Sequence, residues 1–236
     1  MPARVAALYD IHGNLAALDA VLQEVERAGA DALVFGGDLA FGPQPRQVLE
    51  RVMSLGGPVS FVRGNTDREV AERHGVEQGV RGWIAEVNAW CHDQLTPDQR
   101  EFLLSQKAHV TLHVEGLGDV LFVHGSPRSD EEAIRRDTPE AEILPMVAHV
   151  GESIIVCGHT HIQFDRMVAG KRVVNAGSVG LPSAARGACW ALIGPEIELR
   201  ETLYDFERAA AEIRKSGAPK AGEFADDILN PPVAGP

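Results

Sequence analysis

Apolar and polar positions along the first part of the chain alternate between strand periodicity and helix periodicity. Residues 4–9 form an apolar run of strand length, and shorter apolar runs recur at residues 32–35 and 58–62. After the first run, apolar residues return at the spacing of one helix face: Leu15, Leu18, Val21, Leu22 and Val25. Residues 44–53 also have helical spacing. This order of elements predicts parallel strands covered by helices, as in an α/β fold.

Residues 67–106 carry no strand signal, and two helices are expected in their place. The first covers residues 82–94 and the second covers residues 97–106. Thr96 stands at the N-cap of the second helix, and Gln99 stands where a capping box requires it. We expect this stretch to be a helical insertion that caps a pocket.

The rest of the chain predicts short strands in an antiparallel or mixed arrangement. The expected strands cover residues 109–114, 120–123, 153–157, 166–168, 171–174, 188–193 and 197–203. Helices are expected at residues 139–149 and 205–216. Residues 217–236 are rich in proline, glycine and alanine, which predicts a flexible tail or an arm lying on a neighbouring subunit. We therefore expect one domain over residues 1–216. Because an arm can pack on a second copy of the chain, a homo-oligomer is one possible assembly.

Composition limits the size of the core and the classes of partner. With 236 residues and 44% hydrophobic content, the chain can bury one full core but hardly two. Its net charge of -12 argues against binding to nucleic acid or anionic membranes, which requires lysine and arginine in excess on one face. A small phosphorylated substrate, such as a nucleotide, is still compatible with this negative net charge, because bound metal ions reverse the charge locally.

Cysteine usage and the apolar segments predict a cytoplasmic location. The three cysteines, Cys91, Cys157 and Cys189, are spaced neither as a zinc knuckle nor as a redox pair. No segment has the length and apolarity of a transmembrane helix, and residues 1–9 lack the basic start of a secretory signal. We therefore expect a reduced cytoplasm and no membrane association.

Polar residues of metal-binding type follow the predicted strands, at the point where each strand ends. They are Asp10, His12, Asp38, Asn65, His124, His159 and His161. In open α/β sheets ligands bind where strands end, so we expect these side chains to converge. Carboxylate, amide and imidazole donors together suit manganese first, with iron or zinc as alternatives. Seven ligands are too many for one ion, and Asp38 can bridge two ions ~3.5–4 Å apart.

The same residues carry a resemblance to a known family. The motifs are Asp10-Ile11-His12-Gly13-Asn14, Gly37-Asp38, Gly64-Asn65-Thr66-Asp67, His124-Gly125 and Gly158-His159-Thr160-His161. In order and rough spacing they resemble the five motifs of the calcineurin-like metallophosphoesterases. Small bacterial and archaeal phosphodiesterases and diadenosine tetraphosphate hydrolases are the most similar members, because residues 175–180 also look like a segment they share.

The resemblance implies a fold and a division of the ligands. The implied fold is a four-layer αββα sandwich with two mixed sheets. One of two divalent or trivalent transition-metal ions would be held by Asp10, His12, Asp38 and His161. The other would be held by Asp38, Asn65, His124 and His159.

The expected reaction is in-line attack on phosphorus by a metal-bound hydroxide, in a small phosphodiester or nucleotide. Thr66 stands where the commonest form of the family motif has a histidine that is thought to protonate the leaving oxygen. A hydroxyl is a poor general acid near neutral pH, so good leaving groups should be favoured. Asp67 is then expected to bind or position substrate without an imidazole to orient.

Two further residues are candidates for substrate binding. Asn14 could orient a phosphate oxygen at the start of the first helix, or simply cap that helix. Arg128 could meet a phosphate through its guanidinium, or be a solvated loop residue. Two rival functions stay open: a protein serine/threonine phosphatase, and a catalytically weak metal-binding scaffold.

Overall fold

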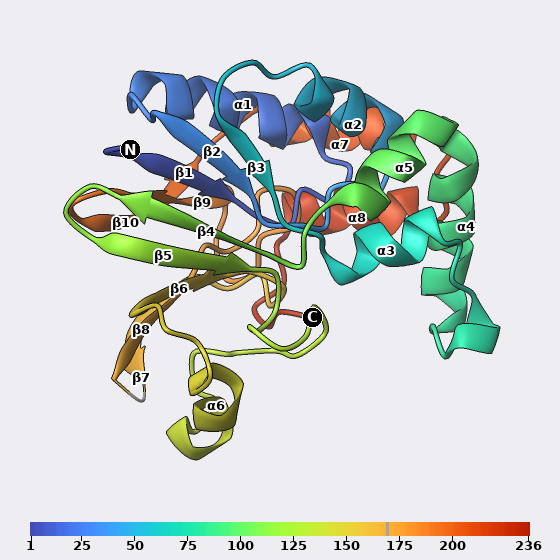
Figure 1. The fold of residues 1–236 in the computed structure, drawn as a ribbon. Helices are drawn as coiled ribbons and strands as arrows, with labels where there is room; N and C mark the ends of the chain where they lie inside the picture. The colour runs from blue at the N-terminus through green and yellow to red at the C-terminus, as the bar shows by residue number, and fades with distance from the viewer. Residues whose placement is uncertain (169) are drawn as a thin grey trace.

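The computed structural model describes residues 1–168 and 170–236, which form two mixed five-stranded sheets stacked between helices (Figure 1). The first sheet contains β1 (Val5–Leu8), β2 (Ala32–Phe35), β3 (Val59–Phe61), β9 (Ala188–Ile193) and β10 (Ile197–Thr202). Its order is β10-β9-β1-β2-β3. As the sequence pattern predicts, β1, β2 and β3 are parallel, whereas β9 and β10 add antiparallel strands at one edge.

The second sheet contains β4 (His109–Val114), β5 (Gly118–Val123), β6 (Ile154–Cys157), β7 (Phe164–Val168) and β8 (Lys171–Asn175). Its order is β4-β5-β6-β8-β7, with β5, β6 and β8 parallel to one another. β4 and β7 pair antiparallel at the two edges. The carboxyl ends of three parallel strands therefore meet at one edge of this sheet, as they do in the first.

Helices cover the outer face of each sheet and complete four layers (Figure 1). The first sheet shares a hydrophobic cluster with α1 (Leu15–Arg27), α2 (Pro45–Met53), α7 (Phe206–Arg214) and α8 (Ala221–Leu229). The second sheet packs against α6 (Glu140–Val147) through Ile143 and Val147. Both sheets and all four layers match the fold that the sequence motifs imply.

Alternation along β1 shows how one strand serves two cores. Ala6 and Leu8 face the helices, whereas Val5, Ala7 and Tyr9 face the second sheet. All five are fully buried, because successive side chains of a strand point to opposite faces. The Tyr9 hydroxyl donates a 3.0 Å hydrogen bond to a carbonyl of β6, at Val156, and so ties the sheets together near their carboxyl edges.

The stretch after β3 is helical, as expected, and contains one helix that sequence reasoning missed. It comprises α3 (Asn65–Ala71), a 3-10 turn (Val76–Gln78), α4 (Gly82–Gln94) and α5 (Pro97–Ser105). The predicted capping box is present, since Thr96 and Gln99 exchange two hydrogen bonds. Val87, Cys91 and Leu103 of this stretch are buried in the cluster of the first sheet. The segment is therefore part of the core rather than a detachable lid.

Residues 217–236, for which composition predicted a flexible tail or arm, instead fold back onto the chain. Phe224, Ala225 and Ile228 of α8 are buried against the first sheet's helices, at a spacing that gives one apolar helix face. Further on, the Ala184 N–H donates to the Pro232 carbonyl at 2.8 Å. In residues 1–168 and 170–236, no helix combines the length and apolarity needed to cross a membrane.

Candidate metal centre

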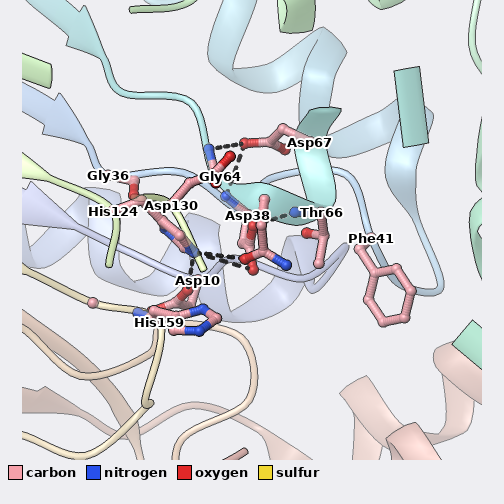
Figure 2. A network of polar contacts seen from close by, with 12 residues as sticks. Asp10, Gly36, Asp38, Phe41, Gly64, Thr66, Asp67, His124, Asp130 and His159 are labelled. Atoms are coloured by element: carbon pink, nitrogen blue, oxygen red, sulfur yellow. Dashed lines mark hydrogen bonds and ion pairs between the residues drawn. The ribbon is translucent and has the colours of Figure 1, made fainter. Parts of the chain in front are cut away.

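The seven predicted ligands come together where the carboxyl ends of the two sheets face each other. Figure 2 shows four of them: Asp10, Asp38, His124 and His159. Asp10 and His12 follow β1, and Asp38 follows β2. Asn65 begins α3 directly after β3. The second sheet contributes the remaining three imidazoles, from the loops after β5 and β6: His124, His159 and His161.

These side chains form two adjacent groups. Asp10, His12 and His161 offer ligand atoms that all lie within 4.8 Å of one another, and so do Asp38, His124 and His159. Asp38 lies between the groups, because its Oδ2 is 3.6 Å from His12 Nε2 and 3.5 Å from His124 Nε2. This is the position that a carboxylate shared by two ions requires.

Asn65 belongs to the second group through its amide oxygen. Asn65 Oδ1 lies 3.1 Å from His124 Nε2, and its Nδ2 is directed to Glu69 at 3.4 Å. Turning the amide nitrogen toward Glu69 leaves the oxygen, a metal-ligating atom, pointing into the cluster. The structure thus brings all seven residues together in one cluster.

Two local features fit a bound cation. Asp10 Oδ1 is buried and has no hydrogen-bond partner within residues 1–168 and 170–236, which is costly for a carboxylate oxygen. His12 Nε2 and His161 Nε2 face each other at 3.0 Å, and at most one of the two neutral rings can donate there. Mixed oxygen and imidazole donors of this kind fit manganese, iron or zinc.

Backbone carbonyls set the orientation of two imidazoles. His12 Nδ1 lies 3.0 Å from the Phe41 carbonyl, and His124 Nδ1 lies 2.8 Å from the Gly36 carbonyl. A carbonyl only accepts, so each Nδ1 carries a hydrogen, and in the neutral ring the Nε2 lone pair is left for the cluster. Such outer contacts fix the tautomer of a metal-binding histidine.

The electrostatics of the cluster are unbalanced in the metal-free chain. Burial raises the pKa of Asp10 well above its usual value, and the Asp38 carboxylate beside it acts in the same direction. Burial would lower the pKa of His124, but Asp38 and Asp10 raise it to about 10. Burial and the neighbouring His124 lower the pKa of His159 to about 4. A proton on His124 therefore offsets buried negative charge that a metal cation would otherwise offset.

Five of the seven ligands have left-handed backbone conformations. Their φ angles are 54° at Asp10, 45° at His12, 56° at Asp38, 64° at His159 and 58° at His161. For residues with a Cβ this region costs about 1–2 kcal/mol each. Strain of this kind persists only where surrounding contacts hold it, and it aims consecutive side chains of a short loop into one site.

Asp67 holds the loop that carries Asp38. Its carboxylate accepts backbone N–H groups from Asp38 at 2.8 Å, Leu39 at 2.8 Å, Ala40 at 3.3 Å and Gly64 at 3.1 Å (Figure 2). Asp67 is fully buried and does not line the cavity above the cluster. The direct catalytic or substrate-binding role expected for it is therefore replaced by a positioning role.

Thr66 lies between the ligand Asn65 and Asp67, on the floor of the cavity. Its backbone N–H donates to Asp38 Oδ1 at 3.0 Å. Its hydroxyl is buried and lacks a hydrogen-bond partner in the described part of the chain. Thr66 therefore lies beside the ligand groups and carries a hydroxyl where the commonest family motif has an imidazole.

Asn14 is a helix cap and not a substrate ligand. It is 1% exposed, and its Oδ1 accepts the Ala17 N–H at 3.1 Å at the start of α1. Its Nδ2 donates to the Gly180 carbonyl at 3.0 Å and to the Tyr204 hydroxyl at 3.1 Å. Both amide hydrogens and the oxygen are thus engaged within the chain, and the substrate-binding interpretation is corrected.

Arg128 also lies outside the site. Its guanidinium pairs with Glu132, four residues further on, and donates to the Pro145 carbonyl at 3.3 Å. It is exposed and does not line the cavity. The alternative of a loop arginine on the surface therefore replaces the predicted phosphate contact.

The segment after β8 holds the ligand loops, a role that sequence reasoning did not assign to it. Asn175 Nδ2 donates to the Gly158 carbonyl at 2.7 Å, between β6 and His159. Ser178 Oγ donates to the Asp10 carbonyl at 2.7 Å, and the Gly180 N–H donates to the same carbonyl at 3.0 Å. The signal available in the sequence was the pair of polar residues Asn175 and Ser178 between two predicted strands, which could have indicated a role in holding neighbouring loops.

A cavity of about 950 Å³ opens above the cluster. Its floor includes His12, Asp38, Asn65, His159 and His161, whereas Asp10 and His124 lie deeper. One wall comes from α4 and the segment before it, and another comes from α8 and residues 232–236. The volume suits a small-molecule substrate.

Comparison with known proteins identifies a family domain and relatives that span most of the chain. The sequence model of the calcineurin-like phosphoesterase superfamily domain matches residues 4–196. An uncharacterized protein of Methanocaldococcus jannaschii is 27% identical over 92% of this chain and 94% of its own. Phosphodiesterase YfcE of Escherichia coli K12 is 25% identical over 80% of this chain and 85% of its own. The crystal structure of a hypothetical protein from Pyrococcus horikoshii OT3 has a TM-score of 0.84 and 22% identity, covering 96% and 97% of the two chains.

Proposed function

The chain belongs to the calcineurin-like phosphoesterase superfamily, and we propose from this premise that it is a dinuclear metal-dependent phosphodiesterase for small phosphoesters. The observation that carries the proposal is the pair of ligand groups with the Asp38 carboxylate between them. A single buried carboxylate that faces imidazoles of two groups is the arrangement that two-metal hydrolysis requires.

The residues divide between the two ions as the geometry groups them. Asp10, His12 and His161 would hold one ion, Asn65, His124 and His159 would hold the other, and Asp38 would be shared by both. Two such ions would supply a nucleophile at neutral pH and offset the charge that develops on the phosphoryl oxygens. Manganese is the proposed first choice, with iron or zinc as alternatives.

The chain's own part in the reaction is placement. Carbonyls at Gly36 and Phe41 fix two imidazoles, and Asp67 fixes the loop of Asp38. Thr66 lines the floor beside these ligands, and its backbone N–H holds Asp38 Oδ1 at 3.0 Å. Ordered ligands of this kind supply orientation before the substrate arrives.

The proposed preference for small diesters rests on the cavity and on one relative. Walls from α4 and α8 enclose the floor, and such walls would hinder access by a phosphorylated protein chain. The E. coli relative bears the name phosphodiesterase, which supports the same reaction for this chain. All seven ligands are present, which argues against a scaffold that has lost turnover.

The test is reconstitution of metal-free protein with manganese, iron, zinc or magnesium, followed by assays on a diester, a monoester, a cyclic nucleotide and a dinucleoside polyphosphate. We expect hydrolysis of the diester with manganese and none after chelation. Asp38→Asn should abolish turnover and lower bound metal toward one ion per chain or fewer, measured by elemental analysis. Asp119→Asn, an exposed change on β5, is the control and should keep full metal and rate. Full metal content and unchanged rate in Asp38→Asn would refute the proposal.

A further inference from the structure

We propose that the cavity holds an aromatic subsite, formed by Trp83 together with Phe41 and Phe224, that binds the planar base of a nucleoside phosphoester. The inference rests on the proposed function, because the ester to be cleaved would lie on the metal floor of the same cavity. It adds a substrate class and a specificity-determining residue to that function.

The three rings form a continuous apolar group that starts at the metal centre. Phe41 is in edge-on contact with the ligand His12, with ring centroids 5.9 Å apart and planes at 83°. The Phe41 ring also contacts Trp83 at 6.4 Å and Phe224 at 6.1 Å, again edge-on in both cases. Trp83 is thus two ring contacts from a metal ligand, a separation that one nucleoside can span between its phosphate and its base.

Trp83 is the member of the group that is open to a ligand. Phe41 and Phe224 are each 6% exposed, whereas Trp83 is 45% exposed and lines the cavity. A large indole that stays exposed beside two buried rings can cover a flat ligand without any rearrangement of the core. Bases stack on such rings irrespective of their identity, because every base has a π face.

Polar groups near these rings can form hydrogen bonds with a base. Glu223 and Asp227 of α8 line the cavity beside Phe224 and can accept hydrogen bonds from amino groups of a base. The lining Lys220 is already paired with Glu223 at 2.8 Å. Arg81 keeps a free guanidinium within the described ranges and can donate to a ring nitrogen or carbonyl.

Part of the subsite lies outside the superfamily domain. Phe224, Glu223 and Asp227 lie on α8, beyond the residues 4–196 that match the superfamily domain. Trp90, seven residues after Trp83 on α4, instead packs against the core of the first sheet and does not line the cavity. The two tryptophans therefore have different roles, and only Trp83 faces the proposed ligand.

The test compares two diesters with the same leaving group, using the manganese-loaded protein. They are the 4-nitrophenyl ester of thymidine 5′-monophosphate and methyl 4-nitrophenyl phosphate. Trp83→Ala should lower kcat/KM about tenfold more for the thymidine ester than for the methyl ester, since stacking on an aromatic ring contributes at about that level. Trp83→Phe, which keeps a ring, should restore most of the difference. Met167→Ala, on exposed β7, should leave the ratio unchanged.

The outcomes separate the subsite from the reaction. Equal losses on both esters, or none on either, would overturn the base subsite while leaving the phosphodiesterase in place. If the unmodified protein cleaves neither ester, the proposed function fails, and binding of thymidine 5′-monophosphate against inorganic phosphate still tests the subsite. Tighter binding of the nucleotide that Trp83→Ala removes and Trp83→Phe keeps would support it. Equal binding of the two ligands would overturn it.

Discussion

Replacing the ligand His161 by glycine should leave the metal-free protein more stable than replacing it by alanine. Both changes remove the imidazole and its contact with His12, so they differ by a single Cβ. At position 161 that Cβ stands on a backbone with φ of 58°, which is left-handed. Alanine must adopt this conformation at a cost, whereas glycine adopts it freely.

The expected difference follows from two opposing terms. Relief of the left-handed conformation favours glycine by about 1–2 kcal/mol. The more flexible unfolded chain of the glycine variant opposes this by about 0.4–1 kcal/mol. The net gain is about 0.5–1 kcal/mol in free energy of unfolding, which for a chain of this length raises Tm by about 1–4 °C.

Urea unfolding of both variants in excess chelator measures this difference directly. The matched control is His113→Gly against His113→Ala on β4, where the backbone is extended and the side chain exposed. Glycine should be the less stable of that pair by about 0.5–1 kcal/mol. If His161→Ala equals or exceeds His161→Gly in stability, the ligand loop is not strained in solution and the argument is wrong.

Two further predictions concern residues next to the ligands. Asp67→Asn should weaken manganese binding by about 10- to 100-fold while the chain stays folded, because an amide cannot accept all the N–H groups that fix the Asp38 loop. Calorimetric titration of the metal-free variant with manganese measures the affinity. An unchanged affinity would show that Asp67 does not position Asp38. Because Thr66 stands where the commonest family motif has a histidine acid, turnover of aryl phosphodiesters should fall steeply as the pKa of the leaving phenol rises. Alkyl esters cleaved as fast as aryl esters would reveal an acid that the present site does not contain.

Sequence reasoning succeeded where the determining contacts are local or follow a strand. Thr96 and Gln99 mark the start of α5 because a capping box lies within four residues. The ligands were recognisable because loops after parallel strands meet at one edge of a sheet, whatever packs elsewhere. Helix α3 was missed because its first residue is the ligand Asn65 and its N-cap, Gly64, offers no side chain that signals a start.

The errors lie where partners are distant in sequence. Asn14 was a candidate for substrate binding or for capping the first helix, but its amide hydrogens go to Gly180 and Tyr204, more than 160 residues away. The composition of residues 217–236 concealed α8, although Phe224 and Ile228 have the spacing of one buried helix face. Periodicity was the better guide there, because a short apolar face can be buried even in a segment rich in glycine and proline.

Different contacts hold the floor of the cavity and the wall formed by α8. The floor residues His12, Asp38, His159 and His161 follow strands of the two sheets, and Asn65 begins α3. Helix α8 is held instead by its own buried face, and it turns Glu223 and Asp227 toward the cavity. Directed evolution confined to Glu223 and Asp227 is therefore expected to change which substrate binds. The proposed metal ligands would stay unchanged.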